Sequence, residues 1–385
     1  MPKVFTAAAL CAVGAEKVVS NEIRKMGLKI EESGFGRVRF KAGLADLYRS
    51  LIGLYAADRV LLEAGRFPAA DFDALFNGVK AIAWEEFVPG GMGLRVDKVR
   101  SNRSRLRAET SIQAIVHKAA AGRLCEKQGI LKLPEGGDEA EIRVYVEKDN
   151  VSILLDLSGE PLFKRGYRTE GGAAPLRETT AAAIIRMAGW KRKFPLYDPF
   201  CGYGTIAAEA ALYAWDLAPG LGRHFTLEKL LISDRAQELQ IRNEFLSKVD
   251  FSRLVRISGS DADPSAALGA KANLERMLRP LTGRTEMRPS MPEIKVLAMQ
   301  EASAPAGESG FIITNPPYGK RLGDLAETET LYAQMPVLAK RFSGWKLALI
   351  TDHPGFESFF GRKADSCKEI TNGAIQTFLY QYDKL

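Results

Sequence analysis

The sequence predicts an α/β protein in which a Rossmann-like sheet occupies the C-terminal part of the chain and smaller α+β units precede it. Three observations support this fold class. Over residues 195–212, a strand pattern is followed by an acid, two spaced glycines and an alanine-rich helix. A second strand ends at Asp261, and a third, at 311–314, stops at Asn315 and two prolines. Because open α/β sheets bind ligands at the carboxyl ends of their strands, all three segments are expected at one edge.

The composition is that of a soluble globular protein with two or three domains: 385 residues, 46% apolar and 26% charged. No apolar run is long enough to span a bilayer, and Ala7–Val13 is expected to be a strand rather than a signal peptide, so we expect a cytoplasmic protein. Four scattered cysteines and three histidines argue against structural metal and histidine-based catalysis. The net charge of +7 permits a nucleic-acid partner.

The loop Asn315-Pro316-Pro317-Tyr318 is the segment most specific to a chemistry. Proline has no N–H, so this loop offers acceptors rather than donors, and the proline after Asn315 holds that residue extended. The Asn315 amide oxygen and the Pro316 carbonyl can accept both hydrogens of an exocyclic amino group, while the Tyr318 ring can stack on the base that carries it. The nitrogen lone pair then faces an electrophile. Taken alone, the loop also fits a tight turn after a core strand.

The glycine-containing loop after the strand at 195–198 is expected to bind a cofactor. It is not a P-loop, because no Gly-Lys-Ser/Thr follows, and Asp198 would repel a pyrophosphate. An acid here favours a positively charged ligand such as S-adenosylmethionine, and Gly202 and Gly204 let backbone approach it closely. The residues predicted to form this contact are Asp198, Pro199, Phe200, Cys201, Gly202, Gly204 and Thr205.

The next two strand ends complete the predicted cofactor site. Asp261 is placed to bind ribose hydroxyls, whereas Asp263 reads as the N-cap of the following helix. A strand over 294–299 ends at Gln300 and Glu301, which could read an adenine amino group; Glu301 also fits an exposed strand end. The set is completed by Ala262, by Asn315 and by Pro175 at a helix entrance.

The most basic stretch is 94–107, where six cations oppose Asp97: Arg95, Lys98, Arg100, Arg103, Arg105 and Arg107. A strand-like half is followed by a polar turn and a helix expected over Ser111–Leu124, and arginines near a helix N-terminus suit phosphate contacts. The alternative is a solvated charged edge. Further RNA contacts are predicted at Lys164 and Arg165 near a domain junction, and at Lys320 and Arg321, which also fit surface loop charges.

Other segments are read from periodicity and turn residues alone. We expect a turn at Gly65-Arg66-Phe67-Pro68, a helix over 328–341 and a strand over 346–351 followed by a closing hairpin. Residues 214–252 form an insertion to which we assign no chemistry, with helices expected over 227–239 and 241–251.

The run Ser101-Asn102-Arg103-Ser104-Arg105-Leu106, followed by Thr110–Ile115, resembles a THUMP domain, the RNA-binding module found beside several RNA-modifying enzymes. That family usually places a small ferredoxin-like domain first, which fits residues 1–65. The resemblance implies a THUMP domain over 66–160, completed by strands at 141–147 and 151–157, and RNA as the partner.

The stretches Tyr197–Thr205 and Asn315–Gly323, behind such a module, resemble class I S-adenosylmethionine-dependent amino-methyltransferases, and more narrowly the large-subunit ribosomal RNA guanine-N2 methyltransferases. The resemblance implies a methyltransferase domain over 161–385, with a mostly parallel seven-stranded sheet that ends in an antiparallel hairpin. It implies methyl transfer to the N2 of a flipped guanine in rRNA, without a metal. Tyr203 departs from the family pattern, which commonly has serine there; its ring is expected to narrow the cofactor mouth.

Three alternatives stay open on the sequence. One is a tRNA guanine-N2 methyltransferase, because nothing in the residues separates rRNA from tRNA. Another is an adenine-N6 methyltransferase of DNA or RNA that uses the same tetrapeptide. The third is a non-catalytic RNA-binding protein, although the intact set Asp198, Asp261 and Asn315 disfavours it.

Overall fold

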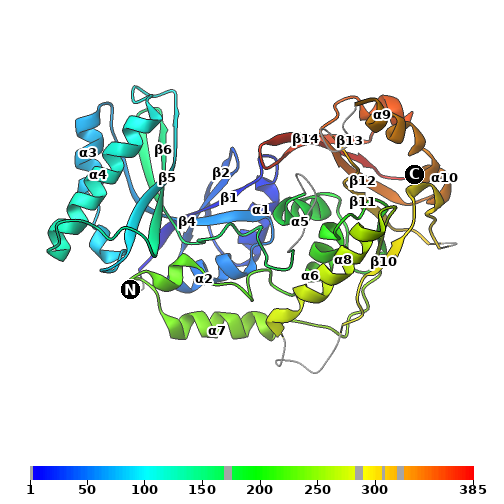
Figure 1. Ribbon diagram of the computed structural model, residues 1–385, viewed down its shortest axis with the longest axis horizontal. Coiled ribbons are helices and arrows are strands. Elements are labelled where there is room, and N and C mark those ends of the chain that lie inside the picture. The colour runs from blue at the N-terminus through cyan, green and yellow to red at the C-terminus, as the bar shows by residue number, and fades with distance from the viewer. Residues whose placement is uncertain (1–2, 169–175, 282–288, 306–307, 319–324) are drawn as a thin grey trace.

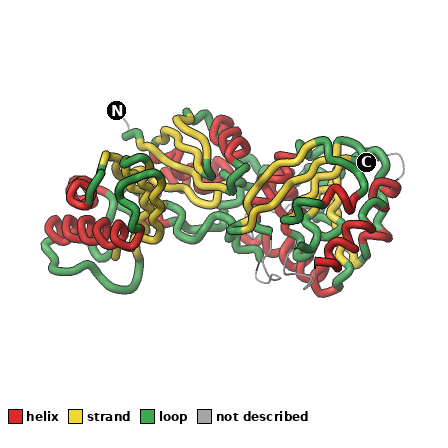
Figure 2. The backbone as a smooth tube through the Cα atoms, turned by 90° about the horizontal axis from the view of Figure 1, so that it is seen from above, coloured by secondary structure: helices red, strands yellow, loops and turns green. Residues whose placement is uncertain are grey.

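The computed structural model describes residues 3–168, 176–281, 289–305, 308–318 and 325–385. Within these residues the strands form two seven-stranded sheets, one in each half of an elongated molecule (Figure 1). Seen from above, the molecule is again long and narrow (Figure 2). None of the helices in these ranges is long and apolar enough to cross a membrane. The predicted site residues Pro175, Lys320 and Arg321 lie outside the described residues.

The first sheet has the strand order β2-β3-β1-β4-β7-β6-β5. Its neighbours pair antiparallel except β5 and β6, which are parallel. The strands are β1 (Phe5–Cys11), β2 (Ile30–Gly34), β3 (Arg37–Ala42), β4 (Ala57–Pro68), β5 (Gly93–Asn102), β6 (Glu139–Glu147) and β7 (Asn150–Asp156).

The long strand β4 joins two units into one sheet, because it pairs with β1 on one side and β7 on the other. The turn predicted at 65–68 is therefore wrong: the chain stays extended through this segment, with a shift of register between Glu63 and Gly65. Gly65 is needed for packing, since a Cβ there would lie 2.7 Å from the Cδ1 of Ile82. A glycine and a proline that suggested a turn instead mark a bulge and a strand end.

Four helices cover one face of the first sheet: α1 (Glu16–Lys25), α2 (Leu44–Gly53), α3 (Phe72–Ala81) and α4 (Glu109–Gln128). Their apolar residues share one core with alternate residues of the strands. The opposite face has a small apolar cluster, formed by Ala8, Leu61 and Leu154. Arginine, lysine and carboxylate side chains surround that cluster, so this face is polar.

The second sheet has the order β10-β9-β8-β11-β12-β14-β13. It confirms the predicted Rossmann-like fold, because β8 to β12 are parallel and the last two strands form an antiparallel hairpin. The strands are β8 (Leu196–Asp198), β9 (Ile257–Asp261), β10 (Glu293–Val296), β11 (Phe311–Thr314), β12 (Lys346–Thr351), β13 (Ser366–Asn372) and β14 (Ile375–Tyr382). The strand order reverses between β8 and β11, where such sheets bind ligands.

Helices cover both faces of this sheet. The apolar residues of α5 (Glu178–Met187), α6 (Thr205–Ala214) and α8 (Pro264–Met277) belong to the core that continues into the first half of the molecule. A second core, on the other face, includes residues of α9 (Leu325–Gln334), α10 (Val337–Arg341) and α11 (Phe356–Phe360). The helix predicted over 328–341 is thus two helices, which separate at Met335 and Pro336.

The insertion at 214–252 contains less helix than its pattern predicts. A short 3-10 turn, Thr226–Lys229, replaces the first expected helix, and α7 (Arg235–Leu246) replaces the second. The helix begins where Asp234 accepts hydrogen bonds from Ala236 N and Gln237 N. It packs against α2, so the insertion braces the two halves (Figure 1).

Candidate active site

Three strand ends meet at the carboxyl edge of the second sheet, as the sequence predicts. Asp198 ends β8, Asp261 ends β9 and Thr314 ends β11. Strand β8 lies between the other two, with Asp198 opposite Gly259 and Tyr197 opposite Ile312. The glycine-containing loop and the Asn-Pro-Pro-Tyr loop therefore leave the sheet side by side.

Asp198 is buried at this edge, with 1% of its surface exposed. Its Oδ1 accepts hydrogen bonds from Thr314 Oγ1 at 2.6 Å and from Phe200 N at 3.1 Å. Burial raises the pKa of this carboxyl to about 7, the two hydrogen bonds oppose the rise, and the charge of Asp261 adds to it. Both of these hydrogen bonds come from neutral donors, and the carboxyl forms no ion pair with any described residue, so a ligand's positive charge could pair with it.

Asp261 ties the glycine-containing loop to the end of β9. Its Oδ2 accepts a hydrogen bond from Gly202 N at 2.8 Å, and its Oδ1 accepts one from Asp263 N at 3.0 Å. Each carboxylate oxygen keeps a further lone pair, which suits ribose hydroxyls. Asp263 caps α8 through Ser265 N at 2.8 Å, as predicted, and Ala262 between the two acids is exposed.

The glycines serve close packing at the same place. Gly204 has φ +80°, and a Cβ there would lie 3.0 Å from the Cβ of Ala270 in α8. A Cβ on Gly259 would lie 2.9 Å from the Cβ of Cys201. Burial raises the pKa of the Cys201 thiol, which keeps it neutral and unreactive. Thr205 begins α6, and Pro199 is buried beside the half-buried Phe200.

Tyr203 is half-buried and packs on a neighbouring helix. Its ring lies against α8, where a Cβ on Gly269 would come within 2.7 Å of the ring. Its carbonyl accepts a hydrogen bond from Asn273 Nδ2 at 2.9 Å. The ring of Tyr203 therefore occupies space left by Gly269, and the prediction that it narrows the cofactor mouth stays a prediction.

Asn315 carries the most unusual polar group of the site. Its Oδ1 is buried and has no hydrogen-bond partner among the described residues. A buried amide oxygen without a partner costs free energy of about 1–3 kcal/mol. Such a cost is sustained where a ligand supplies the missing donor, so this oxygen fits the predicted acceptor for an amino group.

The rest of the loop is held by its neighbours. The carbonyl of Pro317 accepts a hydrogen bond from Tyr332 Oη at 3.2 Å, and Tyr318 Oη accepts one from Asn372 Nδ2 at 3.4 Å. Only 2% of Tyr318 is exposed, so its ring is covered in this structure and does not present a free face to a base. Pro316 is also buried.

The end of β10, where a contact with adenine is predicted, differs from the prediction. Strand β10 ends at Val296 rather than at residue 299, and Gln300 and Glu301 lie on a short 3-10 turn, Met299–Glu301. The bond from Leu297 N to the carbonyl of Asp261 is the last of the ladder between β10 and β9, and the chain then turns so that Met299 enters the second core. Both side chains are exposed, and Gln300 Nε2 donates to Gln334 Oε1 at 2.6 Å. Their contact with an adenine stays a prediction.

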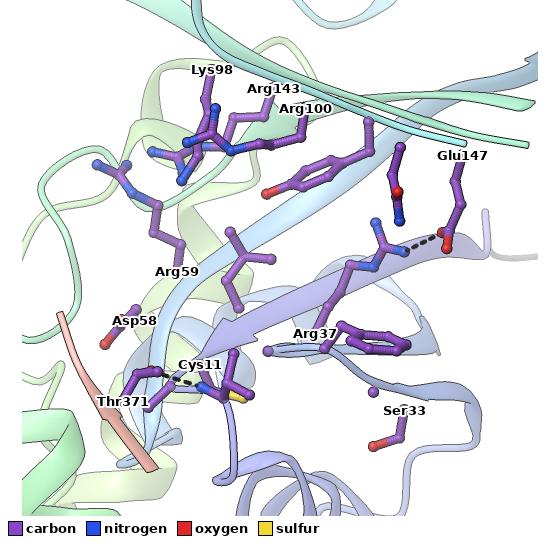
Figure 3. A pocket seen from close by; sticks show the side chains of 18 of the residues that line it. Cys11, Ser33, Arg37, Asp58, Arg59, Lys98, Arg100, Arg143, Glu147 and Thr371 are labelled. Carbon is purple, nitrogen blue, oxygen red and sulfur yellow. Dashed lines mark hydrogen bonds and ion pairs between the residues drawn. The ribbon is translucent and has the colours of Figure 1, made fainter. Parts of the chain in front are cut away.

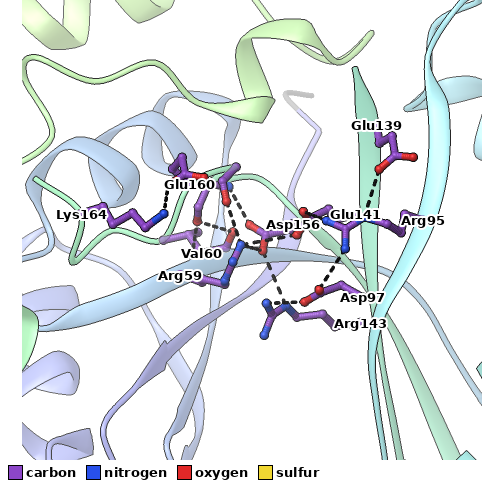
Figure 4. Close-up of polar contacts among 12 residues, drawn as sticks. Arg59, Val60, Arg95, Asp97, Glu139, Glu141, Arg143, Asp156, Glu160 and Lys164 are labelled. Carbon is purple, nitrogen blue, oxygen red and sulfur yellow. Dashed lines mark hydrogen bonds and ion pairs between the residues drawn. The ribbon is translucent and has the colours of Figure 1, made fainter. Parts of the chain in front are cut away.

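The predicted RNA-binding cations differ in whether their charge is already paired. Several are engaged by carboxylates: Arg95 by Asp97, Glu139 and Glu141 and Lys164 by Glu160 (Figure 4). Arg100 is engaged by Glu109 and Arg105 by Asp149. Arg107 Nε donates to the carbonyl of Ser104 at 3.4 Å. Lys98 and Arg103 form no ion pair within the described ranges, and these two remain free for phosphate.

The prediction that Arg165 contacts RNA is wrong. Its side chain is 3% exposed and pairs with the fully buried Glu209 at 3.3 Å. It also donates to the carbonyls of Tyr55 and Leu162, so it joins the two halves of the molecule. Its place beside Lys164 in a basic cluster gave no sign of burial, because the buried acid is 44 positions away.

Two residues of the site were not predicted. Thr314 holds Asp198, and its position as the last residue of a strand was the available signal. Asn372 donates to Tyr318 and accepts a hydrogen bond from Arg177 N at 3.1 Å, a role that only the folded hairpin reveals. Across the described residues no group of three or more His, Cys, Asp or Glu side chains could hold a metal ion.

Comparison with known proteins agrees with this architecture. Residues 6–61 match the model of the RlmL ferredoxin-like domain, residues 69–156 match the THUMP domain, and residues 165–381 match the RMKL-like methyltransferase domain. The boundary near residue 65 lies inside β4, so the first two domains share one sheet.

Individual relatives cover nearly the whole chain. YpsC of Bacillus subtilis, an RNA methyltransferase by name, is 34% identical over 99% of this chain and 96% of its own length. The ribosomal RNA large subunit methyltransferase K/L of Syntrophotalea carbinolica is 34% identical over 96% of this chain. The chain spans about half of that protein, 52% of its length.

A solved structure extends the match to three dimensions. SMU.472, a methyltransferase by its title and complexed with SAH, is 36% identical with a TM-score of 0.87, covering 100% of this chain and 99% of its own. The residues matched by the methyltransferase model make up more than half of the chain and include all three strand ends of the site. The chain therefore belongs to the RMKL-like methyltransferase family.

Proposed function

We propose that this protein transfers a methyl group from S-adenosylmethionine to the exocyclic N2 of a guanine in large-subunit ribosomal RNA. The observation that carries the proposal is the buried, unpartnered Oδ1 of Asn315 at the carboxyl edge of the sheet. The THUMP match supports an RNA substrate, and the names of the K/L relatives support rRNA. The SAH complex of the SMU.472 methyltransferase supports the cofactor.

The residues present suit that cofactor. When bound, S-adenosylmethionine supplies an electrophilic methyl group on a positively charged sulfur. Asp261 would hold its ribose through the lone pairs that Gly202 N and Asp263 N leave available. The backbone at Gly202, where nothing lies within 4 Å of an added Cβ, leaves room for a ligand beside the loop. Asp198 would stabilise the positive end through the low dielectric of its buried position.

The chain's own part in the reaction is to orient the target nitrogen. Asn315 Oδ1 and the Pro316 carbonyl accept the two amino hydrogens, which turns the nitrogen lone pair away from the loop. No general base is required before transfer, because the alkylated nitrogen is acidic and loses its proton to water. The acceleration then comes from positioning and from the fixed polar groups. Stacking of the base on Tyr318 requires that its covered ring become exposed.

The variant Asn315→Ala tests this role directly. We expect methyl transfer to a 23S rRNA transcript to fall at least about 100-fold, since an oriented acceptor of the reacting group is lost. The Kd for S-adenosylmethionine, measured by calorimetry, should change less than twofold. Asn315→Asp, which keeps an acceptor oxygen, should retain more activity than the alanine variant. Equal loss of methyl transfer and cofactor binding would contradict the assignment.

The base and the polymer are tested by product analysis. Nucleosides from methylated 23S rRNA, tRNA and duplex DNA would be separated and identified by mass spectrometry. The proposal expects N2-methylguanosine from rRNA. N6-methyladenine from any of the three, or methylation confined to tRNA, would contradict it.

A further inference from the structure

A cleft of about 970 Å³ lies where the ferredoxin-like, THUMP and methyltransferase domains meet. Eight of its lining residues are lysine or arginine, and three are aspartate or glutamate. Lys98, Arg100 and Arg143 gather on one wall, and Arg37 and Arg59 face them from other strands (Figure 3). All of these side chains belong to the polar face of the first sheet, which the helices leave open.

The charges of this cleft favour an anion. Lys98 and Arg143 lie opposite each other on β5 and β6, and Arg100 lies opposite Tyr145. The pKa of Lys98 is lowered, first by burial and then by repulsion from Arg100 and Arg143. Bringing a negative group into the cleft would relieve this repulsion.

The three acids of the cleft are already engaged in ion pairs, two of them with cations of the cleft itself. Asp58 pairs with Arg177 at 3.1 Å, Glu147 with Arg37 at 3.9 Å and Glu32 with Arg39 at 3.4 Å. Lys98, Arg103 and Lys148 line the cleft and have no carboxylate partner within the described part of the chain. Three uncompensated cations in one cleft suit a chain of phosphates better than a single small anion.

An exposed aromatic ring stands at the same cleft. Phe35 is 95% exposed and lies between two glycines, with φ +50°, a conformation uncommon for a bulky residue. Glu16 holds this turn in place: its Oε1 accepts from Gly36 N at 2.7 Å and its Oε2 from Gly14 N at 2.9 Å. The hairpin thus presents an apolar ring to solvent at a conformational cost, although burying it elsewhere would be favourable.

We propose that this cleft binds an unpaired segment of the RNA substrate, with phosphates on Lys98, Arg103 and Lys148 and a base stacked on Phe35. The combination of cations that follow a backbone and an aromatic ring that stacks on a base is how proteins hold single-stranded nucleic acid. A base inside a duplex is not available for such stacking. This inference rests on the proposed function, from which it takes RNA as the substrate.

The cleft also leads to the reaction loop. Thr371 and Gly373 line it, and Asn372 between them donates to Tyr318 Oη at 3.4 Å. Asn372 accepts from the backbone N of Arg177, which lines the cleft as well. An RNA strand held here therefore lies next to the loop that would receive the target base, which makes Phe35 a positioning residue for methyl transfer.

The test measures binding of a fluorescein-labelled single-stranded oligoribonucleotide, and of its duplex, by fluorescence anisotropy without cofactor. Phe35→Ala should weaken single-strand binding about tenfold and leave duplex binding unchanged, while Phe35→Trp should bind as wild type. Alanine keeps the Cβ, so the backbone strain is the same. Lys98→Gln should lower the slope of log K against log salt by about 0.7. Leu131→Ala, exposed outside the cleft, and Arg95→Gln, on the same strand, are the matched controls and should change neither quantity.

Two results would overturn the inference: Phe35→Ala weakening single strand and duplex equally, or weakening neither. In methyl transfer, Phe35→Ala should raise the KM for RNA and leave kcat nearly unchanged. Asn315→Ala should bind the oligoribonucleotide as wild type. If the wild-type protein methylates no guanine but its cleft still binds the oligoribonucleotide through Phe35, the proposed function alone is refuted. If the wild-type protein methylates guanine but Phe35→Ala does not change the KM for RNA, the role of the cleft alone is refuted.

Discussion

The two sheets of this protein treat their charged residues in opposite ways. On the open face of the first sheet the charges form a continuous alternating chain from Arg59 through Asp156, Arg143 and Asp97 to Arg95 (Figure 4). At the carboxyl edge of the second sheet, Asp198 and Asp261 have no cationic partner within the described residues, and Asn315 Oδ1 has no donor. Charges that stabilise the fold are paired, whereas those at the site are not.

The physical reason for the contrast is the cost of burial. A buried polar group without a partner loses its hydration and gains nothing in return. Asn315 Oδ1 bears this cost in full, and Asp198 bears the part that its two hydrogen bonds do not offset. A ligand that supplies the missing donor or charge recovers it. Unpaired buried groups thus indicate binding more reliably than the number of charged residues in a segment does.

The largest expected effect is a loss of stability when a buried ion pair is broken. Arg165→Ala leaves the buried carboxylate of Glu209 without its partner, and we expect unfolding to become easier by about 3–5 kcal/mol. Urea denaturation followed by circular dichroism measures this loss. The matched control is Lys164→Ala, which removes an exposed ion pair with Glu160 and should change the free energy of unfolding by less than about 1 kcal/mol. Reduced RNA affinity at unchanged stability would show that Arg165 is a functional cation after all.

A smaller effect is expected from the glycine at the site. Gly204→Ala combines a positive φ of +80° with a Cβ 3.0 Å from that of Ala270, and should cost about 1–3 kcal/mol of stability. Gly189→Ala has a similar φ, +72°, but open space around the added Cβ, so it isolates the backbone cost. Thermal unfolding compares the two variants. If Gly189→Ala lowers the unfolding temperature more than Gly204→Ala does, close packing of α6 on α8 is not the reason for glycine at position 204.

The unpaired acid predicts a pH dependence of cofactor binding. Because the pKa of Asp198 is raised to about 7, this carboxyl is mostly neutral at pH 6 and ionised at pH 8. A cation binds the ionised form more tightly, so affinity for S-adenosylmethionine should rise with pH, by up to about tenfold per unit below the pKa. Calorimetry across this range measures it.

The control for that experiment is Asp198→Asn, which removes the titration and should flatten the profile. The same shift has a consequence for stability: the folded state keeps a proton that an unfolded aspartate releases above its ordinary pKa. The free energy of unfolding should therefore fall as pH rises from that ordinary value towards 7, and level off above it. A rising contribution from Asp198 over that interval would contradict its raised pKa.

The smallest effect is expected at an exposed, paired cation. Arg95 is half exposed and contacts three carboxylates, so Arg95→Gln should alter stability by less than about 1 kcal/mol. RNA affinity should change less than twofold, since the guanidinium is already engaged. Denaturation and anisotropy measure the two quantities. A large loss of affinity would mean that RNA displaces those carboxylates, and the distinction between paired and unpaired charges would fail on the first sheet.

The sequence alone predicted the backbone correctly wherever the residues that determine it lie within a few positions of one another. The β-branched run before Asn315, the two glycines after Asp198 and the cap at Asp263 each specify their own backbone. The mostly parallel sheet with its closing hairpin was expected from the family resemblance, and the structure confirms it. Local pattern gave a wrong prediction where a residue from elsewhere in the chain determines the conformation. The sequence around Gly65 predicts a turn, but the segment is an extended strand in which Gly65 makes room for Ile82.

Tertiary structure alone decided which polar residues are free. Arg165 and Lys98 are both cations in basic stretches, yet one is buried against Glu209 and the other lines a cleft without an acid. The difference depends on contacts between residues far apart in the chain, and so do the cleft of three domains and the link from Asn372 to Tyr318. Burial and pairing are properties of neighbours in space, so no reading of neighbours in sequence could have supplied them.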